Sequence, residues 1–216
     1  MIRSALIAAA SITVLSACAS TDPAPTDPAV APAPVPEPTS FERAMITVEG
    51  LEDAGNPQTA IDRLTQLLGE PDLSDEEKAA TLFKRGELRL SDTGFDTFGA
   101  ISDFEEIVTT YPGSAAFPEA NEKLGIARGK ATSLTFVSEQ ADSTREQRFN
   151  ALFTLGEHQD AIDLMTGGGL TPSNEYLVAM YQIGYLCEDE ELTGQAYEAV
   201  EPNGTQRTLR FCDLGK

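Results

Sequence analysis

A short block recurs three times along this chain and limits what it can fold into. Each block begins with Ala-Ile, places a bulky apolar residue four positions after the alanine, and ends at a proline; the three blocks are 60–71, 100–112 and 161–172. Four residues advance a helix by about one turn, so the alanine and the bulky residue share a face. The alanine lets a second helix approach closely, and the proline cannot continue the helix. The pattern therefore predicts paired helices.

The rest of the body favours the same fold class. The alternation typical of strands is nearly absent from 41 to 200, where Gly, Pro and Asp separate segments with helical periodicity. Ser74 and Glu77 have the spacing of a capping box ahead of a helix over 79–90, and Pro172 begins a segment that opens another helix. We therefore predict an all-α domain over 41–200, followed by a C-terminal tail, 201–216.

The recurring block resembles the second helix of the tetratricopeptide repeat, whose first helix also carries a Leu-Gly pair. Gly86 and Gly125 occupy that kind of position. The resemblance implies a short solenoid of helix pairs and leaves 115–141 as an irregular insertion. The segment that begins at Ala100 is similar to repeats of envelope lipoproteins and periplasmic adaptors of the outer-membrane assembly and Tol–Pal types. Repeats would fall near 41–74, 79–114 and 142–175.

The N-terminus indicates an export signal. Arg3 precedes an apolar stretch of 11 residues, Ala5 to Leu15, which is too short for a membrane-spanning helix. The sequence Leu-Ser-Ala-Cys that ends at Cys18 resembles the lipobox of bacterial lipoprotein precursors. The resemblance implies a signal peptide over 1–17, lipid on Cys18, and an anchor in the outer membrane on its periplasmic face. Inner-membrane retention and an ordinary secretory signal with an accidental cysteine are the alternatives.

A proline-rich linker follows the cysteine. Seven of the 22 residues from 19 to 40 are proline, and proline fixes φ and removes an amide donor. We expect 18–40 to be a disordered Pro/Ala-rich spacer with a reach of roughly 60–70 Å. A ligand segment for an aromatic groove is the alternative.

Three cysteines are present. With Cys18 assigned to lipid, Cys187 and Cys212 are an even pair in an oxidising compartment. We expect a disulfide between them that ties the tail back onto the helical domain. Two separate thiols are the alternative.

The charge balance argues against one class of partner. The chain has 15 basic and 35 acidic residues, a formal net charge of −20, and no Lys or Arg between Arg148 and Arg207. Nucleic acid is not expected as a partner, because phosphate binding needs a basic footprint. A basic protein partner of the cell envelope is compatible with this charge. A merely solvated acidic surface is the alternative.

Residues for catalysis or cofactor binding are scarce. His158 is the only histidine, and we expect it to be exposed in a turn between helices. One histidine and two bonded cysteines cannot assemble a zinc site or a Cys–His nucleophile. We therefore predict no catalytic residue, no metal and no cofactor. The alternatives are a cell-wall hydrolase with paired carboxylates and a calcium site whose spacing differs from an EF-hand loop, formed by Asp92, Asp96 and Asp103.

These observations favour a function in binding. Stacked helix pairs present a concave surface that is the usual contact face of such arrays. We predict a lipid-anchored scaffold or adaptor for protein partners in envelope assembly or integrity. A pilus or secretion assembly factor and a purely structural envelope protein are the alternatives. In the layout of the tetratricopeptide family, the partner-facing positions would be Glu42, Met45, Glu49, Glu52, Asp53, Phe83, Glu87 and Leu90.

Overall fold

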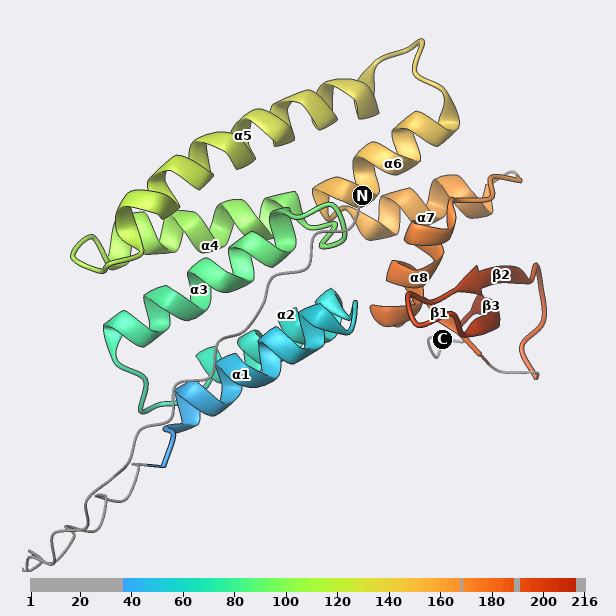
Figure 1. Ribbon diagram of the computed structural model, residues 1–216. Coiled ribbons are helices and arrows are strands. Elements are labelled where there is room, and N and C mark those ends of the chain that lie inside the picture. The colour runs from blue at the N-terminus through green and yellow to red at the C-terminus, as the bar shows by residue number, and fades with distance from the viewer. Residues whose placement is uncertain (1–36, 168, 189–190, 213–216) are drawn as a thin grey trace, which may run out of the picture. The chain divides into compact units, whose positions relative to one another are not determined.

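The computed structural model describes residues 37–167, 169–188 and 191–212 (Figure 1). The predicted signal peptide, the lipidation site Cys18 and the linker up to residue 36 lie outside the described residues, so these assignments stay predictions. All helices and strands belong to the unit that begins at Pro38. Within the described residues, no helix is long and apolar enough to cross a membrane.

Helices dominate the described part of the chain, and three short strands follow them. The helices are α1 (Ser40–Asp53), α2 (Pro57–Leu68), α3 (Asp75–Leu90), α4 (Thr97–Thr110), α5 (Phe117–Glu139), α6 (Arg145–Leu155), α7 (His158–Thr166) and α8 (Asn174–Gln182). The strands are β1 (Leu186–Cys187), β2 (Tyr197–Val200) and β3 (Gln206–Phe211).

Local sequence signals account for where several helices begin. The Ser74 side chain accepts a hydrogen bond from the Glu77 amide, and the Glu77 carboxylate accepts one from the Ser74 amide, which confirms the predicted capping box. Thr39 and Glu42 form the same reciprocal pair at the start of α1. These bonds satisfy amides that the first turn of a helix otherwise leaves without a partner.

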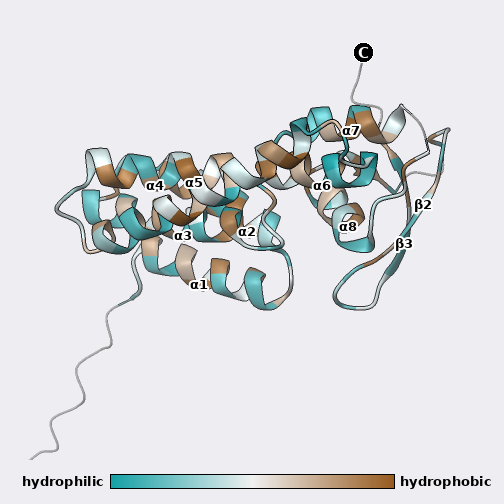
Figure 2. Cartoon of the chain, turned by 90° about the horizontal axis from the view of Figure 1, so that it is seen from above, coloured by the Kyte–Doolittle hydropathy of each residue, from teal (hydrophilic) through white to brown (hydrophobic). Residues whose placement is uncertain are grey.

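From α1 to α7, helices that follow one another in sequence pack against each other, and from α1 to α6 they run in alternating directions (Figure 1). The helices carry both hydrophobic and hydrophilic residues (Figure 2), as expected for helices with one buried side. The alanines of the recurring block are fully buried at these contacts: Ala60, Ala100 and Ala161. The bulky residues four positions later are buried with them: Leu64, Phe104 and Met165.

Gly86 lies where α3 meets α4. A Cβ atom added at Gly86 would lie 2.7 Å from a ring carbon of Phe104, well inside van der Waals contact, so the close approach requires glycine. The Phe104 ring also contacts Phe83, with 5.9 Å between the ring centroids. Gly125 is different, because it is exposed and has open space around it. Of the two glycines placed at the Leu-Gly position of the repeat, only Gly86 therefore lies at a close helix contact.

The segment 115–141 was expected to be an irregular insertion, and that expectation is wrong. A single helix of 23 residues, α5, occupies most of it. Pro118 lies in the first turn, where its missing amide donor is tolerated. The buried side of the helix is lined by small residues and one leucine among charged neighbours, which hides the helical period in the sequence. These buried residues are Ala120, Leu124, Ala127 and Ala131.

The all-α prediction is also corrected at the C-terminus. Helix α8 ends at Gln182, and an antiparallel three-stranded sheet with the order β1-β3-β2 follows it. Tyr197 of β2 and Leu209 of β3 are opposite each other and buried, and β1 and β2 both contact α8. The sheet forms because these side chains complete the apolar core around α8, which the helices alone leave open.

Cys187 and Cys212 lie at disulfide distance, with their Cα atoms 5.0 Å apart. Cys187 belongs to β1, and Cys212 directly follows β3, the strand that pairs with β1. The expected link between the tail and the domain is therefore present in the structure. The tail it holds is a sheet strand and not a loose extension.

Candidate functional site

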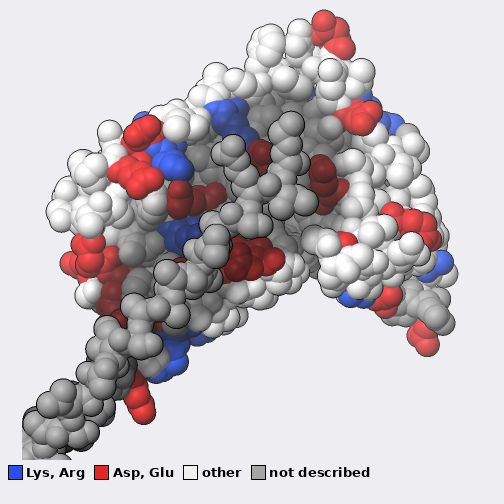
Figure 3. Space-filling model, viewed as in Figure 1, with Lys and Arg blue, Asp and Glu red and all other residues white. Residues whose placement is uncertain are grey.

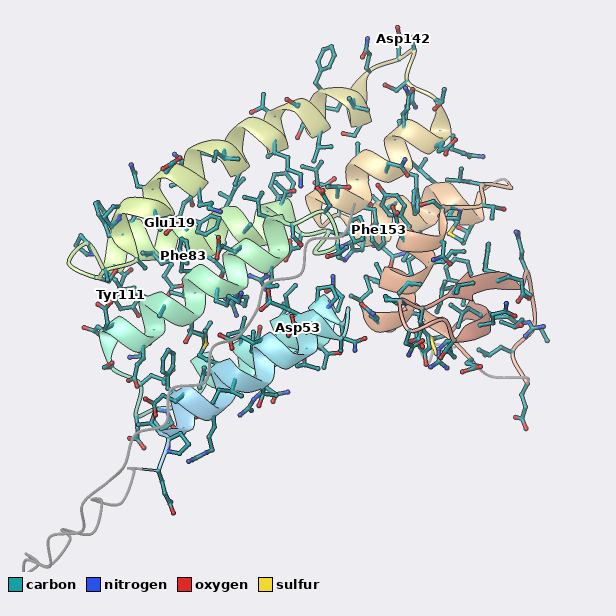
Figure 4. The ribbon with its side chains drawn as sticks, in the orientation of Figure 1. Asp53, Phe83, Tyr111, Glu119, Asp142 and Phe153 are labelled. Atoms are coloured by element: carbon teal, nitrogen blue, oxygen red, sulfur yellow. A yellow bond between two sulfur atoms is a disulfide. The ribbon has the colours of Figure 1, made fainter. Side chains whose placement is uncertain are left out.

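The three apolar members of the predicted partner-facing set are partly buried and pack against the protein core. Met45 packs against the core cluster formed by α1, α2 and Leu88 of α3. Phe83 and Leu90 pack against the cluster shared by α3, α4 and α5, and Figure 4 shows Phe83 on α3 beside α4. These three side chains therefore contribute to helix packing, and their assignment to a binding surface stays a prediction.

Three of the acidic members are engaged with other parts of the chain. Glu42 caps α1. Glu52 forms an ion pair of 2.8 Å with Lys84, which joins α1 to α3, and Glu87 forms one of 2.8 Å with Lys123, which joins α3 to α5. The hydrogen bond to Glu87 raises the pKa of Lys123 above its ordinary value. These ion pairs hold neighbouring helices together, so the face carries fewer free charges than the sequence suggests.

Glu49 and Asp53 are exposed, as is Glu42. Unlike Glu42, Glu49 and Asp53 make no side-chain hydrogen bond or ion pair with the rest of the described chain. Asp53 is the last residue of α1 (Figure 4). Among the acidic members of the predicted set, these two therefore carry exposed charges that no described residue neutralises.

A groove with a volume of about 490 Å³ lies between the helix hairpin α1–α2, the α3–α4 loop, α8 and the end of β2. We call it the junction groove. Its volume is within the range of pockets that hold small ligands or single side chains of a partner, roughly 300–1,000 Å³. The lining residues are Glu52, Gly55, Pro57, Leu88, Ser91, Thr93, Phe95, Asn174, Glu175, Val178, Ala179, Gln182, Val200 and Pro202.

Phe95 contributes to this groove from an unusual backbone conformation. Its φ is 49°, and it is the one described non-glycine residue at positive φ. Such a conformation costs on the order of 1–3 kcal/mol and persists only where surrounding contacts enforce it. Here the ring contacts Phe153 and Tyr176, at 5.3 and 4.8 Å between centroids. The Phe95 carbonyl lies 2.8 Å from Nε2 of His158.

The walls of the groove are held by contacts between distant segments. Buried Gln58 of α2 donates a hydrogen bond of 2.9 Å to the Gly94 carbonyl in the α3–α4 loop. Gln182 of α8 reaches the α1–α2 turn, where it donates to the Gly55 carbonyl at 3.4 Å. A Cβ atom on Gly55 would lie 2.9 Å from Pro202, and the φ of Gly55 is +73°, so both the turn and the contact require glycine. The groove therefore exists without a ligand to shape it.

The rim of the groove is acidic. The described residues that line it include Glu52 and Glu175 and no Lys or Arg. Glu175 is exposed in the first turn of α8, whereas Glu52 is paired with Lys84. Figure 3 shows acidic side chains gathered over the C-terminal end of α1, next to a hollow in the surface. The local charge thus favours a cationic group at the mouth of the groove.

Asn174 shapes the rim through the backbone of β2. Its side-chain amide donates to the Val200 carbonyl at 2.8 Å, and its side-chain oxygen accepts from the Val200 amide at 2.7 Å. The side chain thus pairs with β2 as a neighbouring strand would. It fixes Val200, which is 45% exposed, at the edge of the groove.

His158 was expected to be exposed in a turn, and this expectation is corrected. It is partly buried as the first residue of α7, and its ring lies 4.6 Å from that of Phe153. Its hydrogen bond to the Phe95 carbonyl connects α7 to the α3–α4 loop. The histidine therefore supports the backbone beneath the groove.

Two of the three candidate calcium ligands are already bound to arginines. Asp103 is 1% exposed and accepts hydrogen bonds from Arg85 and Arg89, at 2.6 and 2.9 Å. Asp96 pairs with Arg89 and caps α4. Across the described residues, no group of three or more His, Cys, Asp or Glu side chains is placed to hold a metal ion. Asp96 and Asp103 therefore have a structural role, because their ion pairs with arginines of α3 connect α3 to α4.

Sequence reasoning missed the junction groove because four separate segments build it. The one local signal was Phe95, a large aromatic residue in the polar, glycine-containing loop 91–96. In comparisons with known proteins, no family model, no curated protein and no solved structure matches this chain.

Proposed function

We propose that this chain is a lipid-tethered, non-catalytic scaffold that binds a partner protein at the periplasmic face of the outer membrane. The lipobox-like sequence ending at Cys18 supports the tether. The sequential helix pairs support a tetratricopeptide-like array, a class that acts through binding surfaces. A tether raises the effective concentration of a bound partner near the membrane without any new contact.

The observation that carries this proposal is the open junction groove. Its floor is apolar, and its walls are held in place by the chain itself. Its polar groups serve structural contacts: Asn174 binds the Val200 backbone through both side-chain groups, and Glu52 is paired with Lys84. A preformed apolar recess with satisfied walls suits an anchor side chain of a partner.

The rival hydrolase needs two carboxyl groups about 5–10 Å apart, one of them free to act as a proton donor or base. At the junction groove one of the two carboxylates, Glu52, is held in an ion pair. No observation at this site favours hydrolysis over binding, so we do not adopt that rival.

Site-specific photocrosslinking in the source organism tests the proposal. A photoreactive residue is placed at Thr93, which is exposed and lines the groove, and a matched one at Thr109, which is exposed on α4 outside it. We expect a protein adduct from position 93, and not from position 109, in the outer-membrane fraction. In a Cys18→Ser background the adduct should leave that fraction. Equal labelling from both positions, or none from position 93, would refute the groove as the binding site.

A further inference from the structure

The floor of the junction groove is made of side chains that are almost fully buried. Leu88, Phe95 and Val178 are 6%, 6% and 8% exposed. Ala179 beside them lines the recess with only a methyl group. A recess of this kind gains stability by covering an apolar side chain of about the size of leucine or phenylalanine.

The acidic charge at the mouth of the groove favours a cationic group beside the bound apolar side chain. Glu175 is exposed and has no side-chain ion pair within the described residues. The chain has no Lys or Arg between Arg148 and Arg207, the stretch that includes α8 and β2. Lys84 already pairs with Glu52, so Glu175 is the acid of the groove lining that is left to attract a cationic group next to the apolar anchor.

The polar groups on the walls have the chemistry that recognises peptide backbone. Gln182 makes two hydrogen bonds, both at 3.4 Å, to the Gly55 carbonyl and to the Asn56 side chain. The Ser91 hydroxyl donates to the Leu88 carbonyl at 2.6 Å, so the Thr93 hydroxyl is the donor in its 3.4 Å contact with Ser91. Thr93 is exposed, and a contact of this length is weak. The Thr93 hydroxyl can therefore bond to an entering peptide carbonyl while the contacts between the walls stay in place.

We propose that the junction groove binds a short segment of a partner protein in which an apolar side chain lies within two or three residues of a Lys or Arg. This inference rests on the proposed function and names the chemistry of the partner. The chain's own linker is a poor occupant, because residues 19–36 carry Asp22 and Asp27 and no base. A second copy of this chain is also a poor occupant of the groove, because two chains with a net charge of −20 each repel one another.

Selection from a random heptapeptide library tests the proposal. The full-length chain in detergent is the bait, and enriched peptides are synthesised and their dissociation constants measured. We expect enrichment of peptides that pair one Leu, Ile or Phe with a nearby Lys or Arg. Binding should weaken as NaCl rises from 50 to 500 mM, because exposed ion pairs are screened by salt.

Two variants with matched controls test whether the groove is responsible. Glu175→Lys should weaken binding by about twofold to fivefold, the scale of an exposed ion pair. Glu146→Lys, an exposed acid in the first turn of α6, makes the same change at a helix start outside the groove and should leave binding unchanged. Thr93→Trp fills the groove and should weaken binding at least tenfold, whereas Thr109→Trp should not.

The outcomes separate this inference from the proposed function. Enrichment of neutral or acidic peptides, or enrichment of the linker sequence, would overturn the inference. So would a failure to enrich any peptide, or binding that survives Thr93→Trp. If crosslinking at position 93 nevertheless yields a partner adduct, the scaffold function stands and only the stated partner chemistry falls.

Discussion

The contact between Gly86 and Phe104 allows a sharp test of the helix packing. Replacing Gly86 by alanine should improve helix propensity by about 0.5–1 kcal/mol. The new Cβ atom, however, would lie 2.7 Å from the Phe104 ring, about 1 Å closer than normal contact. Phe104 is fully buried, so the ring cannot move out of the way without disturbing α3 to α5. Overpacking of this kind costs about 1–3 kcal/mol.

Gly125→Ala is the matched control, because Gly125 is also helical but has open space around it. We expect Gly125→Ala to raise the free energy of unfolding by about 0.5–1 kcal/mol, and Gly86→Ala to lie about 1–3 kcal/mol below it. Urea denaturation of the full-length variants, followed by circular dichroism at 222 nm, measures both. If Gly86→Ala stabilises the chain as much as Gly125→Ala, the close approach of α3 and α4 is wrong.

Three further predictions follow from other contacts. Asp103→Asn should lower the free energy of unfolding by about 3–5 kcal/mol, because it leaves two arginine side chains without their buried acid. The control Glu105→Gln removes an exposed ion pair on the same helix and should change the free energy of unfolding by less than about 1 kcal/mol. Similar losses in the two variants would contradict the buried bridge. Replacing both cysteines of the disulfide, which are 25 residues apart, by serine should cost about 3.5 kcal/mol in the chain-entropy model; an unchanged urea midpoint would mean that the bond does not form. Hydrogen bonds from Ser74 lower the pKa of Glu77 in the folded chain. The stability gained from these bonds is therefore complete above the pKa of Glu77 in the unfolded chain and is lost as pH falls through its lower pKa in the folded chain. Ser74→Ala should raise the Glu77 pKa in a carboxyl NMR titration, and an unshifted midpoint would contradict the capping box.

Helix positions could be predicted from the sequence because their signals are local. The capping box at Ser74 and the alanine with a bulky residue four positions later are each contained within a few residues. The long helix α5 was missed because its buried side consists mainly of alanine, so the apolar period is weak beside its charged neighbours. The resemblance to a repeat family placed Phe83 and Leu90 on a partner-facing side, and it gave no signal that both also pack against the core cluster of α3, α4 and α5.

The sheet and the groove depend on contacts that the sequence does not display locally. Strands β2 and β3 are short. Tyr197 and Leu209 are buried because they pack against the core around α8. The junction groove joins residues as far apart as Gly55 and Pro202, whose contact could be recognised only once the fold was known. The positive φ of Phe95 follows from contacts with α6 and α8 and from no signal in its own loop.

The most direct test of the account is a comparison of dissociation constants for the partner captured at position 93. The affinities of the full-length chain, of Thr93→Trp and of Thr109→Trp are measured side by side under the same salt conditions. The account predicts that only Thr93→Trp binds at least tenfold more weakly, with all three chains equally stable to urea. Equal affinity of all three chains for the partner would contradict the claim that the junction groove holds it.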